Sequence, residues 1–127
     1  MSEEWTTAKL WKTLDTNFEL LRAETARRLG WKEVEVNDIT HVVTGIPPHW
    51  GDGKTAEVVP NYPLFIAMAW EIAEFVEQQG DTLMIRFDPE RDDKRWTVMI
   101  GDERVDCNHV PYGLCMAFCS IDYAKLE

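Results

Sequence analysis

The sequence predicts an α+β protein in which an antiparallel β-sheet is flanked by α-helices. Two observations carry this expectation. Apolar residues recur three or four positions apart in three separate segments, and two short segments alternate apolar and polar residues. Because 127 residues with 45% hydrophobic content suffice for one core but are few for two, we expect a single domain over residues 1–127.

The first expected element is a long helix over about residues 3–29, which precedes a core region at 31–124. Its apolar stripe consists of Trp11, Leu14, Phe18 and Leu21. Gly30 follows as a helix stop. Strands are expected at 31–36 and 39–44, where β-branched residues are frequent.

A long loop is expected from Gly45 to Pro60, and its prolines and tryptophan favour an ordered binding surface. A second helix then runs to about Gln79. Asn61 or Tyr62 is expected to cap it, with Pro63 in its first turn.

A hairpin follows, with strands at 82–87 and 95–101 around a turn at 88–93. Alternation places Phe87 and Arg86 on opposite faces of the first strand. In the second strand it places Trp96 on one face and Arg95 on the other, so we expect Arg86 and Arg95 to share a face. Arg104 and Val105 are expected in a short third strand, and Pro111 opens a last helix that runs to about Ala124.

The net charge of −10 disfavours duplex nucleic acid as a partner, because neutralising phosphates requires clustered lysine and arginine. It leaves room for a small anionic ligand, since charges beyond about 8 Å are largely screened at physiological salt. No run of about 18 apolar residues is present, and the N-terminus lacks the features of a signal peptide. We therefore expect no membrane contact and a cytoplasmic location.

Metal chemistry has one candidate set, which consists of Cys107, His109, Cys115 and Cys119. Its spacing lacks the close cysteine pairs of structural zinc sites, so we expect the cysteines in the core, with a metal site as the alternative. The acidic turn Asp88–Asp93 lacks the glycine and terminal glutamate of a calcium loop and is expected to be a solvated turn. No metal or cofactor is predicted.

No catalytic residue is predicted. Neither Ser2 nor Ser120 lies in a Gly-x-Ser-x-Gly elbow. The glycines before Lys54 lack the spacing of a phosphate loop. The three histidines show no paired spacing, so cleavage of a cyclic nucleotide is the weakest functional interpretation.

The stronger functional signal is a group of arginines in the hairpin region: Arg86, Arg95 and Arg104. Guanidinium groups bind phosphates bidentately, and a neighbouring ring such as Phe87 or Trp96 can stack a nucleobase. The alternative is a solvated sheet face on which the arginines pair with Asp92, Asp93 or Asp102.

Several segments, in this order, resemble the phage ABA-sandwich domain family and, within it, the sponge proteins that counter Thoeris defence. They are Leu29–Trp31, Gly45–Pro48, Val59–Tyr62, Ala67–Ile72, the hairpin around Trp96, and Val110–Phe118. The resemblance covers about residues 18–124.

This resemblance implies a protein that is not an enzyme. Such sponges bind cyclic ADP-ribose isomers, and some also bind cyclic di- or trinucleotides at a separate site; the ligands are released intact. The resemblance further implies an antiparallel sheet flanked by helices, homo-oligomers that are dimers or hexamers, and action in the cytoplasm of the infected bacterium.

The predicted ligand-binding residues follow from residue chemistry. They are Arg86, Arg95 and Arg104 for phosphates, Phe87 or Trp96 for stacking, and Asn108 for a polar edge. Arg28 and Lys54 are predicted at a second anion site between subunits, although Arg28 can instead pair with Glu24. The 45–60 loop is expected to act as a lid, because slow release needs contacts shut off from water. A phage structural or interaction domain without a small ligand is the alternative function.

Overall fold

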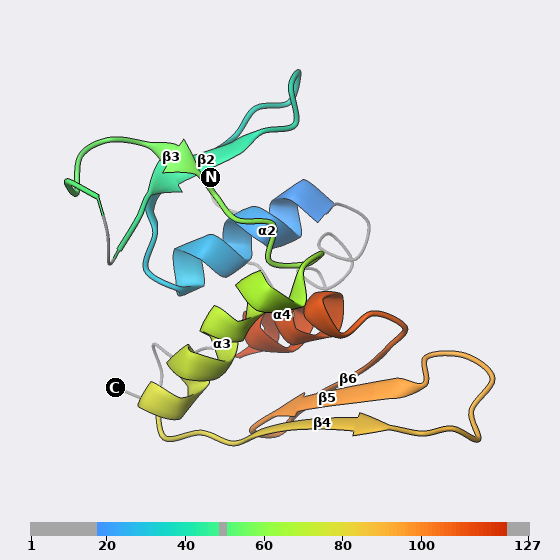
Figure 1. The fold of residues 1–127 in the computed structure, drawn as a ribbon. Coiled ribbons are helices and arrows are strands. Elements are labelled where there is room, and N and C mark those ends of the chain that lie inside the picture. The colour runs from blue at the N-terminus through green and yellow to red at the C-terminus, as the bar shows by residue number, and fades with distance from the viewer. Residues whose placement is uncertain (1–17, 49–50, 122–127) are drawn as a thin grey trace, which may run out of the picture.

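The computed structural model describes residues 18–48 and 51–121, and it confirms the α+β class. In chain order its elements are α2 (Phe18–Arg28), β1 (Lys32–Val36), β2 (Val43–Ile46), β3 (Glu57–Val58), α3 (Ile66–Gln78), β4 (Leu83–Phe87), β5 (Trp96–Ile100), β6 (Glu103–Cys107) and α4 (Val110–Ser120) (Figure 1). The first part of the expected helix at 3–29, with Trp11 and Leu14, lies outside the described residues. The last helix is shorter than expected: it ends at Ser120, because Ile121 has extended backbone angles, and does not continue to about Ala124.

The strands form two antiparallel sheets rather than one. Their strand orders are β1-β2-β3 and β4-β5-β6. The helices lie between the two sheets: α2 packs against β1 and β2, α4 packs against β5 and β6, and α2 and α4 contact each other (Figure 1). Helix α3 contacts α4 and β4. The antiparallel sheet that the sequence predicted around the hairpin is therefore β4-β5-β6, with helices on one of its faces.

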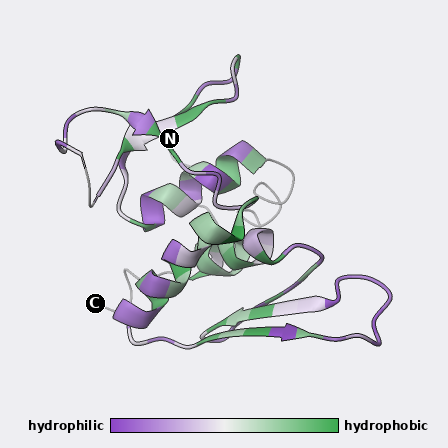
Figure 2. Cartoon of the chain, in the orientation of Figure 1, coloured by the Kyte–Doolittle hydropathy of each residue, from purple (hydrophilic) through white to green (hydrophobic). Residues whose placement is uncertain are grey.

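The core fills the space among these helices and strands. Its largest fully buried side chains include Tyr62, Phe118, Leu21, Ile72, Ile100 and Leu114. Burial of each such apolar side chain stabilises the fold by about 1.5–3 kcal/mol relative to exposure. The turn between β4 and β5 and the loop before β3 are hydrophilic by contrast (Figure 2). Among the described helices, none combines the length and the apolar character that a membrane crossing requires.

The expected strand at 39–44 is wrong in its first half. Ile39 is 89% exposed and lies in the turn between β1 and β2. The Asn37 side chain closes this turn, because its Oδ1 accepts hydrogen bonds from the backbone N–H of Ile39 at 2.9 Å and of Thr40 at 3.0 Å. Local side-chain bonding of this kind competes with strand pairing, so β2 starts only at Val43.

The expected loop from Gly45 to Pro60 is shorter than predicted. Gly45 and Ile46 belong to β2, and Glu57 and Val58 pair back onto β2 as β3. The hairpin and its loop lie on the opposite side of the helices from β4-β5-β6 (Figure 1). Within one protomer this loop therefore does not act as a lid over the arginines of the second sheet.

The second expected helix starts later than the cap residues predicted. The residue that caps α3 is Phe65, which has extended backbone angles. The backbone carbonyl of Asn61 accepts a hydrogen bond from the Phe65 N–H. Tyr62 is fully buried; its hydroxyl accepts a 3.1 Å bond from Trp31 Nε1 and donates a 3.0 Å bond to Glu71 Oε2. These bonds hold the residues before Phe65 in a turn instead of a helix.

The hairpin prediction is confirmed. Leu83 to Phe87 pair residue by residue with Ile100 to Trp96. The third strand is longer than the expected Arg104 and Val105, since β6 covers five residues and pairs with β5 over its whole length. This additional strand brings Arg104 and Asp106 beside the residues of β5.

Candidate functional site

The outer face of β4-β5-β6, away from α4, carries a groove. Register places Met84, Met99 and Arg104 in one row across the three strands, and Arg86, Thr97 and Asp106 in the next. Directly paired residues share a face of a sheet. The groove has a volume of about 170 Å³ and is lined by Met84, Arg86, Asp88, Arg91, Thr97, Met99 and Arg104.

Asp106 organises one side of this groove. Its Oδ1 accepts a 2.8 Å hydrogen bond from Thr97 Oγ1, and it lies 3.3 Å from both Arg104 Nε and Arg91 Nη1. The Thr97 bond is the main cause that holds the pKa of Asp106 below its usual value; burial opposes it, and the bonds from Arg91 and Arg104 add to the lowering. The carboxylate therefore stays ionised and fixes two guanidinium groups beside the groove.

Arg91 is held from three directions. Besides Asp106, it contacts Asp88 Oδ2 at 3.3 Å and donates a 3.1 Å hydrogen bond to the backbone carbonyl of Lys94. Arg86 differs, because it has neither a hydrogen bond nor an ion pair within residues 18–48 and 51–121. The three guanidinium groups face only two carboxylates, which leaves a local excess of positive charge on a chain whose net charge is −10.

Two of the predicted phosphate ligands, Arg86 and Arg104, thus line one groove, but Arg95 does not. The expectation that Arg86 and Arg95 share a face is wrong. The guanidinium carbon of Arg95 lies 5.1 Å from the centroid of the Phe87 ring, and its Nη2 donates a 2.7 Å bond to the Pro89 carbonyl. Arg95 precedes β5 and follows Lys94, which has a positive φ of 48°. Strand alternation therefore does not extend back to Arg95.

The predicted stacking residues lie on the other face of the sheet from Arg86. Phe87 and Trp96 are paired across β4 and β5, and their ring centroids are 4.9 Å apart with planes tilted by 50°. Their row continues to the buried Cys107. A ligand in the outer groove of one protomer consequently has no direct access to these rings through the sheet.

Asn108 closes the β4–β5 turn. Its Oδ1 accepts a 2.8 Å bond from the backbone N–H of Lys94, and its Nδ2 donates a 2.9 Å bond to Asp93 Oδ1. The bond from Asn108 is also the main cause that lowers the pKa of Asp93. Both ends of the Asn108 amide therefore hold the turn in place.

The residues predicted for a second anion site are distant from the groove. Arg28 lies 3.1 Å from Glu24 and also donates to the Ile121 carbonyl, which ties α2 to the end of α4. Lys54 belongs to the loop before β3, where its backbone N–H donates a 2.8 Å bond to Asp52 Oδ1. Arg28 pairing with Glu24 was the alternative that the sequence left open, and the structure shows this pair.

The cysteines lie in the core. Cys107, Cys115 and Cys119 are buried free thiols, and Cys119 Sγ lies 3.5 Å from Thr25 Oγ1. His109 Nε2 lies 2.8 Å from the Leu64 carbonyl oxygen. No three His, Cys, Asp or Glu side chains gather into a metal-binding group in the part of the chain that the structure describes.

Sequence reasoning missed Arg91 and Thr97 as lining residues of the groove, and Asp106 as the carboxylate that holds Arg91 and Arg104. Thr97 and Asp106 could have been found by carrying the alternation of β5 across to a full-length third strand. Arg91 could not, because it lies in an irregular turn whose geometry is set by Asp88 and Asn108 rather than by periodicity.

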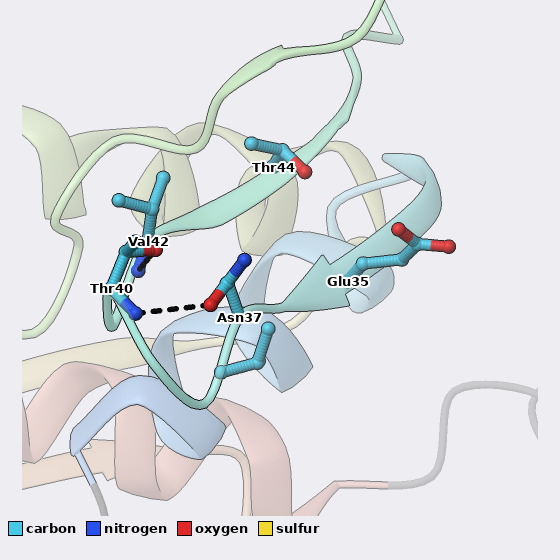
Figure 3. A pocket seen from close by; sticks show the side chains of 6 residues that line it. Glu35, Asn37, Thr40, Val42 and Thr44 are labelled. Atoms are coloured by element: carbon cyan, nitrogen blue, oxygen red, sulfur yellow. Dashed lines mark hydrogen bonds between the residues drawn. The ribbon is translucent and has the colours of Figure 1, made fainter.

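A second hollow lies at the end of the other sheet. It has a volume of about 370 Å³ and is lined by Glu35, Val36, Asn37, Thr40, Val42 and Thr44 (Figure 3). The Asn37 oxygen is already engaged by the turn. The charged side chain in its lining is the carboxylate of Glu35, which disfavours an anionic ligand.

Comparison with known proteins identifies no relative: no protein-family model, curated protein or solved structure matches the chain. The resemblance to the phage ABA-sandwich family therefore remains a prediction from the sequence.

Proposed function

We propose that the chain is a phage anti-defence protein that binds a cyclic nucleotide immune signal and holds it without cleavage. The favoured ligands are cyclic ADP-ribose isomers, with cyclic oligonucleotides as further candidates. The observation that carries this proposal is the groove in which Arg86, Arg91 and Arg104 come together on an otherwise acidic chain. Charge-assisted bonds from guanidinium groups are the strong contacts that phosphate binding requires.

The mixed lining of the groove supports a nucleotide rather than inorganic phosphate. Met84 and Met99 add polarisable apolar surface beside the arginines. The depressed pKa of Asp106 favours binding over hydrolysis, because a carboxylate that already accepts three hydrogen-bonding groups is a poor general base at neutral pH.

The size of the groove supports an oligomer as the binding unit. Pockets that enclose small molecules usually measure about 300–1,000 Å³, whereas this groove measures about 170 Å³. One protomer can hold the phosphates of such a ligand but not surround the whole molecule. We propose that a second copy, in a dimer or hexamer, completes the enclosure over the outer face, in the cytoplasm of the infected bacterium.

Calorimetry of the purified full chain with cyclic ADP-ribose isomers and cyclic di- and trinucleotides tests this function. Heat release, followed by recovery of ligand with unchanged mass after the protein is heated, supports a sponge. A ligand with changed mass would make the protein an enzyme, and absence of heat with every ligand would refute binding.

A second candidate function is an interaction domain, and the edge strand β4 favours it. Met84 and Phe87 are 45% and 44% exposed, and Ile85 is 36% exposed. In the described sheet β4 has a neighbour on one side only, and exposed apolar edge strands are templates for pairing with another strand. Analytical ultracentrifugation of the Ile85→Lys variant separates the candidates. Assembly that the Ile85→Lys substitution abolishes, in a protein that binds none of the nucleotides, favours the interaction domain.

A further inference from the structure

Strand β4 is the least protected edge of the two described sheets (Figure 1). Three of the five residues in β1 are charged, as are three of the five in β6, and β3 has only two residues. Charged side chains and short length keep an edge strand from pairing with another chain. In β4 only Arg86 is charged, and Met84, Ile85 and Phe87 are between 36% and 45% exposed. Of the four edges, β4 is therefore the one suited to accept another strand.

The free backbone groups of β4 belong to alternate residues. The backbone N–H of Gly101 donates a 2.9 Å hydrogen bond to the Thr82 carbonyl, and the N–H of Asp88 donates a 2.7 Å bond to the Arg95 carbonyl. In an antiparallel strand the N–H and C=O of one residue point to the same side, and this side alternates along the chain. Thr82 and Asp88 point to β5, and so do the even-numbered residues between them. The N–H and C=O groups at the open edge are consequently those of Leu83, Ile85 and Phe87.

These groups are arranged symmetrically about Ile85. When Ile85 lies opposite Ile85 of a second, antiparallel copy, Leu83 lies opposite Phe87 of that copy. Every N–H and C=O at the edge then has a partner, and the two strands pair over their whole length. A two-fold axis through Ile85 generates this arrangement, so a second copy of the chain is a fitting occupant of the edge.

The neighbouring registers are less favourable. With Arg86 opposite Arg86 of the second copy, two like charges lie directly across from each other, which is destabilising. With Phe87 opposite Phe87, Ile85 meets Pro89, which has no N–H to donate. The geometry of the edge therefore selects the register centred on Ile85.

This register is also complementary in charge. The guanidinium of Arg95 lies 5.1 Å from the centroid of the Phe87 ring, on the face of the sheet that carries the helices. Pairing brings Phe87 to the start of the second copy's β4, beside the end of its α3, which contacts β4. That end carries Glu74 and Glu77 and no basic residue, and the helix dipole adds partial negative charge there. Opposite charges therefore meet on both sides of the two-fold axis.

We propose that two copies of the chain pair through β4 in an antiparallel arrangement with Ile85 on the two-fold axis. The sheets β4-β5-β6 of both copies then form one continuous sheet. This inference rests on the use of β4 as an interaction edge, which is the second candidate function, and it adds the partner and the register. Pairing removes the exposed side chain of Ile85 from water in both copies.

Disulfide mapping tests the partner and the register together. The register places Met84 directly opposite Arg86 of the second copy, with Cα atoms about 4.5 Å apart, a separation that permits a disulfide. In either single cysteine variant the two introduced residues are diagonal, about 7–8 Å apart. A mixture of the Met84→Cys and Arg86→Cys proteins, incubated together under reducing conditions and then oxidised, should form a mixed disulfide dimer about tenfold faster than either variant alone. The native cysteines are at most 4% exposed, so they should not compete.

A mixture of Met84→Cys with Ile39→Cys is the matched control. Ile39 is 89% exposed in the β1–β2 turn, so this mixture measures disulfides that form by random collision. A rate for the Met84→Cys and Arg86→Cys mixture no greater than that of the control would overturn the proposal. A faster disulfide in Arg86→Cys alone would overturn it as well, because it would place Arg86 on the axis.

Sedimentation of chains without introduced cysteines gives a second readout. Wild type should sediment with at least twice the mass of the chain, and Ile85→Lys should halve that mass, because two like charges would meet on the axis. Circular dichroism checks that this variant is folded, and Ile39→Lys is the control that should keep the wild-type mass. A monomeric wild type, or a folded Ile85→Lys of unchanged mass, would refute the proposal. No nucleotide is present in either experiment, so these outcomes are independent of whether the chain binds one.

Discussion

Thr97 and Asp106 face each other across β5 and β6, and the Thr97 hydroxyl donates a 2.8 Å hydrogen bond to the carboxylate. Thr97 is buried, whereas Asp106 is more open. The buried Thr97 hydroxyl therefore fixes the Asp106 carboxylate, and this carboxylate in turn positions Arg91 and Arg104.

Replacing Thr97 by valine keeps the shape of the side chain and removes the bond. We expect a loss of about 1 kcal/mol in the free energy of unfolding at neutral pH, measured by urea denaturation. Because the folded pKa of Asp106 is lowered, its stabilising contribution is present above the usual carboxyl pKa of 3.8 and is lost as the pH falls below that value. The difference between wild type and Thr97→Val should therefore shrink in acid. A difference that persists unchanged at low pH would show that the hydroxyl acts independently of the Asp106 charge.

Arg86→Gln should weaken binding of a phosphorylated ligand by about 1.5–3 kcal/mol, because Arg86 lines the groove and a bond to a charged group is lost. Titration calorimetry measures the change. Arg95→Gln is the matched control: it removes a guanidinium from the same hairpin, but one that lies against Phe87. Equal losses in both variants would argue against the groove as the binding site.

Gly113 in α4 allows the helix to approach the sheet. A Cβ at this position would lie 2.4 Å from Cys107 Sγ and 3.2 Å from Val98 Cγ2. Gly113→Ala should therefore destabilise the fold by about 1–3 kcal/mol, although alanine favours helix formation. Thermal unfolding checks this change. In the Cys107→Ala background the sulfur is absent, so the cost of Gly113→Ala should be smaller there; an equal cost in both backgrounds would contradict this account.

Tyr62→Phe should cost about 1–3 kcal/mol, because it leaves the buried Trp31 N–H and the Glu71 carboxylate without their shared partner. Burial and then the neighbouring Glu71 charge raise the pKa of Tyr62 above its usual value of 10.0. The contribution of the neutral hydroxyl is thus fully present below pH 10 and is lost as the pH rises further. Chemical denaturation at neutral pH and above pH 10 checks this expectation. Between these two conditions the free energy of unfolding should fall more in wild type than in Tyr62→Phe.

Sequence periodicity predicted the regular elements well and the turns poorly. The alternation of Leu83 to Phe87 and of Trp96 to Ile100 gave the correct faces, because successive side chains of a strand point to opposite faces of the sheet. Ile39 was placed in a strand for its β-branched side chain, but the bonds to Asn37 decide its conformation. Arg95 was placed by extending alternation one residue too far, across the positive φ of Lys94. The groove depends on such turn geometry and on the pairing of β6, which no local pattern specifies.

Arg86 and Phe87 are neighbours in the chain, yet they point to opposite sides of a strand that the described sheet leaves open along one edge. A charged ligand can contact both Arg86 and Phe87 of one protomer only if it reaches around the open edge of β4. Another strand that hydrogen-bonds there would occupy the same space. Under the two proposed functions, a ligand that wraps around this edge and a strand that pairs with it would therefore compete for β4, and self-association at high protein concentration would weaken ligand binding.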